Sequence, residues 1–198
     1  MDTLALDDLM PTFDATRIEH RVVEAPPAVV YAATIRADLV ESVRRNRVVT
    51  GLFAVRAGAE RLVSTLRGGP ATEPPDMATM RLGDLPEHGE WVRLAEDPPH
   101  ELAFGAIGRF WGGATSWKQI DAAEFPSFAT PGFAKIAASI SLRPYGGKRT
   151  LVIYEARTLA TDDGARRSFL RYWNLVSPGV GIVMRSALAL VDDEARGA

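Results

Sequence analysis

The end of the sequence constrains the fold most, because one long amphipathic stretch runs from Thr161 to Arg196. Its large apolar side chains recur every three or four residues, as on one face of a helix. A helix of this kind must bury that face, and the strand-like sequence before it supplies a sheet to lie on. A sheet that curls around the helix leaves a cavity between the two. The apolar positions are Phe169, Trp173, Val176, Val180, Met184, Ala187 and Val191.

We expect this helix to run from about residue 162 to residue 195. Thr161 or Asp162 can accept hydrogen bonds from the unpaired backbone amides of its first turn. Pro178 has no amide hydrogen and is followed by Gly179, so it should bend the helix near its middle. A bend lets one end of the helix pack closely against the sheet while the other end lies farther from it.

The chain opens with a predicted strand and a short helix. Residues Arg17 to Val23 alternate polar and apolar side chains, which places Ile18, His20 and Val22 on one face, and we expect that face to point inward. The two prolines that follow end the strand and suit a first helical turn, so PPAVVYAATI, residues 26–35, predicts a helix.

Residues 38–77 form an excursion of predicted helices and one loop. Apolar residues recur at helical spacing up to Arg67. The segment that follows, GGPATEPPDM, residues 68–77, is rich in the glycine and proline residues that are typical of a flexible loop. The stretch from Arg44 to Arg67 is rich in arginine. Either it is the solvated face of packed helices, or it rests weakly on an anionic membrane surface.

From residue 79 onward the period changes to two, which predicts strands. The separators LPEHG, DPP, WGG and PYGGK supply turn residues, and the last of them predicts a hairpin. We expect strands at Thr79 to Leu82, Glu90 to Glu96, Glu101 to Phe110, Thr115 to Ile120, Phe133 to Arg143 and Arg149 to Leu159.

The alternation also predicts which side chains of three strands face the terminal helix. Many of them are small, which leaves space behind the helix. The rows are Leu102, Phe104, Ala106, Gly108 and Phe110; Ala134, Ile136, Ala138, Ile140 and Leu142; and Val152, Tyr154, Ala156 and Thr158.

Composition excludes several classes of function. With 23 basic and 25 acidic residues, the net charge of −2 gives no electrostatic case for nucleic-acid binding. Cysteine is absent, which removes disulfides, thiolate nucleophiles and Cys-ligated metals. The acidic start does not resemble a secretory signal, and no apolar run is long enough to predict a transmembrane segment. We therefore expect one domain over residues 1–198 and a cytoplasmic location.

Catalytic and cofactor motifs are missing from the sequence. His20, His88 and His100 lack the spacing of a metal site, and we expect neither a metal nor a cofactor. The serines lack the G-x-S-x-G context, and the glycine pairs do not form a nucleotide-binding loop. His20, on the face expected to point inward, is either a general acid or base or a hydrogen-bonded histidine beside the core.

The order of elements resembles the START-like or Bet v 1-like (SRPBCC, polyketide cyclase-like) superfamily. The opening resembles the family in Ala25, Pro26 and Tyr31, which follow the first strand. The segments GRFWGG and RRSFLRYWNLVSPGVGIVMR together look like a bacterial branch of this superfamily of uncharacterised function. The resemblance implies an α+β helix-grip fold, in which a curved antiparallel sheet of about six or seven strands wraps round the long C-terminal helix. It also implies an apolar cavity for lipids, polyketides or similar molecules, without a shared catalytic set.

The leading hypothesis is a protein that binds a hydrophobic small molecule in this cavity. Phe104, Phe110 and Trp173 would form its aromatic wall or simply fill the core, with Tyr154 and His20 as polar tips. Arg109 is a further candidate if its strand bulges. The alternative is a polyketide cyclase or aromatase in which His20 or Tyr154 shuttles a proton. Other partners considered are an anionic membrane surface and a second copy of the chain in a homodimer.

Overall fold

A computed structural model describes residues 4–38, 81–88, 90–111 and 115–197 of the chain. Most of the predicted excursion, residues 39–77, and with it the basic stretch from Arg44 to Arg67, lies outside the described residues. The elements in chain order are α1 (Ala5–Leu9), β1 (Ala15–Val23), α2 (Pro27–Arg36), the 3-10 helix η1 (Leu82–His88), β2 (Val92–Asp97), β3 (Glu101–Arg109), β4 (Ser116–Lys118), β5 (Ala134–Pro144), β6 (Thr150–Ala160) and α5 (Asp163–Arg196).

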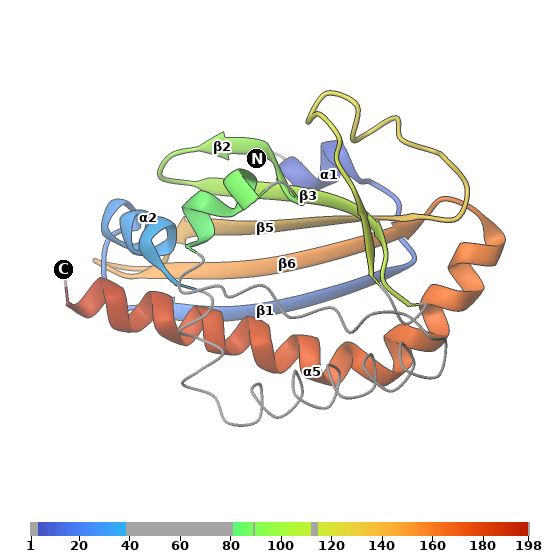
Figure 1. Cartoon of the computed structure of the whole chain (residues 1–198). Helices are drawn as coiled ribbons and strands as arrows, with labels where there is room; N and C mark the ends of the chain where they lie inside the picture. Colours follow the sequence, from blue (N-terminus) through green and yellow to red (C-terminus); the bar gives the residue numbers. More distant parts are fainter. Residues whose placement is uncertain (1–3, 39–80, 89, 112–114, 198) are drawn as a thin grey trace.

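The strands of the described residues form one antiparallel, six-stranded sheet in the order β1-β6-β5-β3-β2, with β4 paired to the end of β3. Helix α5 runs along one face of this sheet, and α2 lies near the C-terminal end of α5 (Figure 1). We call the face toward α5 the inner face and the opposite one the outer face. This arrangement confirms the predicted α+β helix-grip fold.

Helix α5 begins where the sequence predicts. The Asp162 carboxylate caps it by accepting hydrogen bonds from the amides of Gly164 at 2.7 Å and Ala165 at 2.9 Å. Pro178 lies within the helix, where it cannot donate the hydrogen bond that a regular turn requires. The helix follows a curved path beneath the sheet rather than a straight one (Figure 1).

The hairpin between β5 and β6 is also confirmed. Its turn contains Gly146 and Gly147 with φ angles of 56° and 61°, a conformation that residues with a Cβ atom rarely adopt. The register then aligns Ile140 of β5 with Tyr154 of β6 and with Leu102 of β3. The inner-face rows predicted for β3, β5 and β6 are therefore confirmed.

The face predicted for β1 is wrong. His20 pairs with Ile153 of β6 and points, with it, to the outer face, while Glu19 pairs with Tyr154 on the inner face. The physical reason is that α5 carries charged partners for the polar residues of β1. Arg185 donates to Glu19 at 2.7 Å, and Arg21 donates to Asp192 at 2.8 Å.

The outer face is partly covered by α1, which the sequence analysis did not predict. Arg157 of β6 holds its C-terminal end by donating to the carbonyl oxygens of Leu6 at 2.9 Å and Met10 at 3.0 Å, and it pairs with Asp7 at 2.6 Å. At the other end, the Ala5 amide donates to Glu101 at 3.0 Å. A second correction concerns the strand predicted up to Leu82, because Leu82 begins η1 instead.

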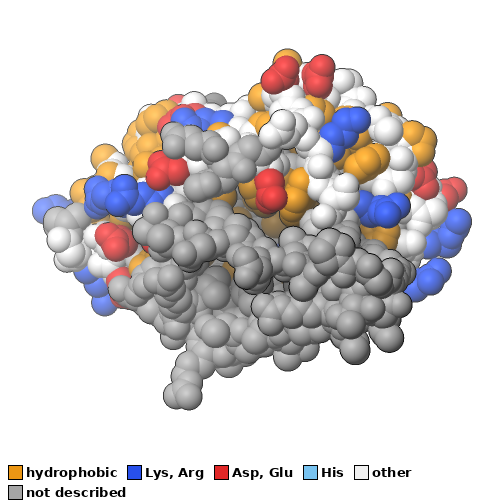
Figure 2. Space-filling view, in the orientation of Figure 1, with side chains coloured by type: hydrophobic (Ala, Val, Ile, Leu, Met, Phe, Trp, Pro, Cys, Tyr) orange, Lys and Arg blue, Asp and Glu red, His pale blue; other side chains and the backbone are white. Residues whose placement is uncertain are grey.

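Charged side chains of both signs are interspersed on the described part of the face shown in space-filling form, among many hydrophobic ones (Figure 2).

Candidate ligand-binding site

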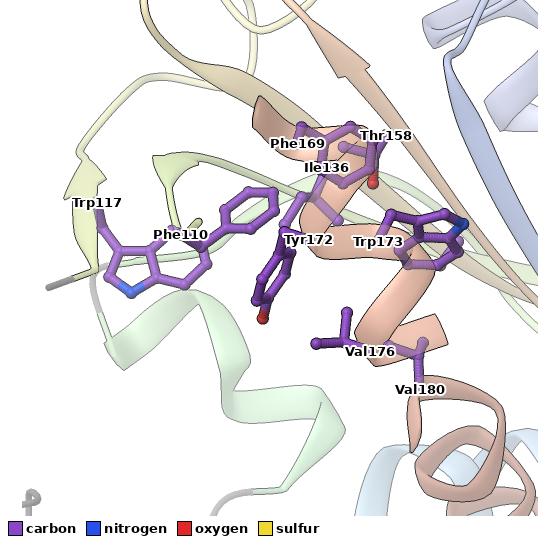
Figure 3. A pocket seen from close by; sticks show the side chains of 10 residues that line it. Phe110, Trp117, Ile136, Thr158, Phe169, Tyr172, Trp173, Val176 and Val180 are labelled. Atoms are coloured by element: carbon purple, nitrogen blue, oxygen red, sulfur yellow. The ribbon is translucent and has the colours of Figure 1, made fainter. Parts of the chain in front are cut away.

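A pocket of about 210 Å³ lies between the inner face of the sheet and the N-terminal half of α5. Aromatic side chains from the strands and from the helix surround it (Figure 3). We call this part of the molecule the pocket end. The lining residues are Phe110, Trp117, Ile136, Ala156, Thr158, Phe169, Tyr172, Trp173, Val176 and Val180.

The pocket exists because the inner-face rows become smaller toward this end of the sheet. Ala156 and Thr158 of β6 and Gly108 of β3 stand where bulkier residues would fill the space under α5. Gly108 also gives room to an aromatic ring, since a Cβ atom there would lie 2.6 Å from Cε3 of Trp117. The indole of Trp117 can therefore approach the backbone of β3 closely and form one wall of the pocket.

Ring contacts hold the aromatic wall together. Phe110 meets Phe169 edge-on, with ring centroids 5.9 Å apart and planes at 84°. It also lies 6.1 Å from the Trp117 ring and 5.9 Å from the Tyr172 ring, and Phe169 lies 5.9 Å from Trp173. Each of these contacts is in the range of favourable aromatic pairs, so the wall is preorganised.

The lining carries little polarity, and none of its side chains is charged. On the sheet side the hydrogen-bonding groups are the indole N–H of Trp117, which can only donate, and the hydroxyl of Thr158, a residue that is 6 % exposed. Its oxygen points into the pocket region next to Ile136 (Figure 3). Among the described residues, none forms a hydrogen bond with this hydroxyl.

The six residues proposed from the sequence divide into three pairs. Phe110 and Trp173 line the pocket. Phe104, 3 % exposed, and Tyr154 belong to the inner-face core beyond it. His20 is exposed on the outer face, and Arg109 is exposed at the end of β3, on the row opposite to Gly108. The register shift of this part of the sheet falls between Arg93 and Ala95 of β2, so no bulge in β3 turns Arg109 inward.

Tyr154 remains a candidate polar group of the inner face. Burial raises the pKa of its hydroxyl, so the phenol stays protonated at neutral pH and has a hydrogen available to donate. It packs against the core cluster rather than lining the described pocket.

Sequence analysis missed Trp117 and Tyr172 as lining residues. Tyr172 follows Phe169 by three positions, a helical spacing that could have included it in the apolar stripe. Trp117 lies in a strand of three residues, too short to show an alternation. Its link to the pocket depends on its pairing with Gly108, which is a tertiary feature.

One side of the site is closed by contacts between β1 and α5. Arg17 lies against Gly181 so closely that a Cβ atom at Gly181 would collide with its guanidinium group. Arg17 and Arg185 both pair with Glu19. The guanidinium groups of Arg17 and Arg185 and the carboxylate of Glu19 therefore pair with one another beside the apolar lining.

The described residues also bear on a metal site and on a membrane-spanning helix. No three His, Asp or Glu side chains among them gather where they could hold a metal ion. Of the described helices, α5 has the length and composition of a membrane span, with a mean hydropathy of 1.5 over an 18-residue window that is 33 % buried. Core helices of soluble proteins meet the same criterion, so this is weak evidence for a span.

No protein-family model and no curated protein matches the sequence. Solved structures with a similar arrangement include a conserved protein from Geobacillus kaustophilus, at 8 % identity and a TM-score of 0.43 over 92 % of this chain and 96 % of that one. Another is the Zhui aromatase/cyclase from Streptomyces sp. R1128, at 13 % identity and a TM-score of 0.31 over 92 % and 93 %. A protein from Arthrobacter aurescens shows 14 % identity and a TM-score of 0.39 over 92 % and 87 %.

These similarities are too distant to carry an argument about ligand or activity. The protein has an α+β helix-grip fold with an apolar pocket at one end. This class follows from the strand order, the terminal helix and the residues that line the pocket.

Proposed function

We propose that the protein binds a hydrophobic small molecule in the pocket between the sheet and α5. The observation that carries this proposal is a preformed hollow lined by aromatic and aliphatic side chains without a charge. Ligand sites of proteins are concave and mostly apolar, with a few polar groups that orient the ligand. The Thr158 hydroxyl is a group of that kind.

The size of the pocket limits the ligand. At about 210 Å³ the described pocket is smaller than the roughly 300 Å³ at which drug-sized sites begin. It is larger than an apolar cavity of about 150 Å³ that takes up benzene. A compact molecule, or the compact end of a longer one, therefore fits the described walls.

We do not extend the proposal to cyclase or aromatase chemistry. The described lining contains no histidine, carboxylate or lysine that could move a proton. His20, the candidate acid or base of the sequence analysis, is exposed on the opposite face of the sheet. The pKa of Tyr154 is raised by burial, which makes its phenol a poor base at neutral pH.

Native mass spectrometry of the purified protein tests the proposal, followed by denaturing extraction and small-molecule mass spectrometry. The matched control is Ala156→Leu, because the larger side chain fills the pocket from β6. We expect a hydrophobic passenger or an added apolar probe such as naphthalene to bind the natural protein and to be lost from the variant. Equal retention by both proteins would show that the molecule is bound elsewhere.

A further inference from the structure

We propose that the ligand is uncharged and flat, has one or two fused rings and carries one hydrogen-bonding oxygen, and that Thr158 selects for this oxygen. This inference rests on the proposed function and makes it specific. It follows from the size, the charge and the polarity of the lining, taken in turn.

Size and shape point to a flat ring system. A pocket of about 210 Å³ exceeds the space that takes up one benzene ring, about 150 Å³, by less than half. Its walls include the rings of Phe110, Trp117 and Trp173 (Figure 3). Aromatic rings pack best against other rings, either offset and stacked or edge to face, so a planar ligand uses this surface better than a branched aliphatic one.

The absence of charge in the described lining selects against ions. The nearby charges of Arg17, Glu19 and Arg185 already pair with one another at the edge of β1 and α5. An ionised ligand would lose its hydration without gaining a counterion from the lining, which is costly in an apolar site.

Thr158 provides the polar contact. Its hydroxyl can both donate and accept, so it suits a phenol as well as a carbonyl oxygen. Since no described residue hydrogen-bonds to it, a ligand oxygen would meet a group that is not already engaged. The floor around it consists of Ile136 and Ala156, which offer no competing side-chain polar group.

The experiment compares three probes, naphthalene, 2-naphthol and 2-naphthoate, by isothermal titration calorimetry. It uses the natural protein, Thr158→Val and Thr158→Ser. Valine keeps the shape and removes the hydroxyl, while serine keeps the hydroxyl. Thr16→Val, an exposed threonine on the outer face of β1, is the matched control. NMR of methyl-labelled valines locates binding, because Val176 and Val180 line the pocket whereas Val23 and Val152 lie in the core.

We expect Thr158→Val to weaken 2-naphthol binding by about three- to tenfold, as for the loss of one neutral hydrogen bond, and to leave naphthalene within about twofold. Thr158→Ser and Thr16→Val should retain the natural preference, and 2-naphthoate should bind at least about tenfold more weakly than 2-naphthol. Equal effects of Thr158→Val on naphthalene and 2-naphthol, or tighter binding of 2-naphthoate, would overturn this inference while the proposed function stands. If none of the probes shifts the Val176 and Val180 methyl signals, the proposed function itself fails for this pocket.

Discussion

The two ends of the layer between α5 and the sheet are built from the same helix and the same three strands, yet one is filled by a cluster of large buried side chains and the other contains a pocket. At the closed end, Leu188 and Val191 of α5 meet large inner-face residues such as Leu142 and Val152, together with α2. At the pocket end, α5 presents aromatic and valine side chains to a floor of smaller residues. Side-chain size along each strand, rather than a change of topology, therefore creates the cavity.

The ends also differ in how the helix is held. At the closed end, the buried carboxylate of Asp192, 1 % exposed, accepts from Arg21 at 2.8 Å and from Arg196 at 2.9 and 3.0 Å. Toward the pocket end the corresponding contact is between Glu19 and the half-exposed Arg185. The start of α5 is held as well, because Arg166 pairs with Asp14 at 2.7 Å, so the closed end differs in having the more deeply buried carboxylate.

Truncating one side chain at each end of α5 should give the strongest contrast in stability. Leu188→Ala removes a side chain that is 2 % exposed, and we expect it to lower the free energy of unfolding by about 3 kcal/mol. Val176→Ala removes a partly exposed pocket wall and should cost less than about 1 kcal/mol. Urea unfolding measures both values, and equal losses would contradict the distinction between the ends.

The next contrast adds volume instead of removing it. Ala33→Leu places a larger side chain at a fully buried position of α2, and overpacking should cost about 2 kcal/mol. Ala156→Leu fills existing space, and we expect it to raise the free energy of unfolding by about 0.5 kcal/mol or more. A large loss in Ala156→Leu would mean that the pocket end is as tightly packed as the closed end.

The anchor of the closed end gives a smaller effect. Asp192→Asn keeps the shape of the side chain but removes the charge that two arginines bind, and we expect a loss of about 1.5 kcal/mol. The loss should shrink when Arg21→Ala is already present, because the two residues act together. Additive losses in this double-mutant cycle would show that the pair is not coupled.

The smallest effect concerns pH at the edge near the pocket. Burial opposes ionisation of Glu19, but hydrogen bonds from Arg17 and Arg185 outweigh it and lower its pKa from the ordinary value of 4.5. The stability that this provides is present above pH 4.5 and is lost as the pH falls through the lowered value in the folded protein. Glu19→Gln should therefore cost less than about 1 kcal/mol at pH 7 and progressively less in acid. Unfolding measured from pH 7 to pH 3 tests this, and a pH-independent difference would contradict it.

Much of the fold could be predicted from the sequence because its signals are local. The Asp162 cap, the hairpin with Gly146 and Gly147, and the alternation of β5 and β6 need no knowledge of their neighbours. The face of β1 could not be predicted in the same way. Its inward polar residues are stabilised by partners such as Asp192, which is distant in the sequence, so an alternating pattern could not show which face is buried.

The candidate site was only partly predictable for the same reason. Phe110 and Trp173 lie on rows that the alternation and the helical stripe identify. Trp117 lines the pocket because it pairs with Gly108, and the inference about Thr158 depends on the absence of a hydrogen-bond partner among the described residues. Both are properties of the folded chain.

The placement of Trp117 on Gly108 gives this protein an optical reporter of its own. Two of its 4 tryptophans, Trp117 and Trp173, line the pocket, and the ring of Trp91 lies 6.4 Å from that of Trp117. A molecule that enters between these indoles changes their surroundings and the coupling between neighbouring rings. Occupancy of the pocket therefore alters the intrinsic fluorescence and near-ultraviolet circular dichroism without any added label.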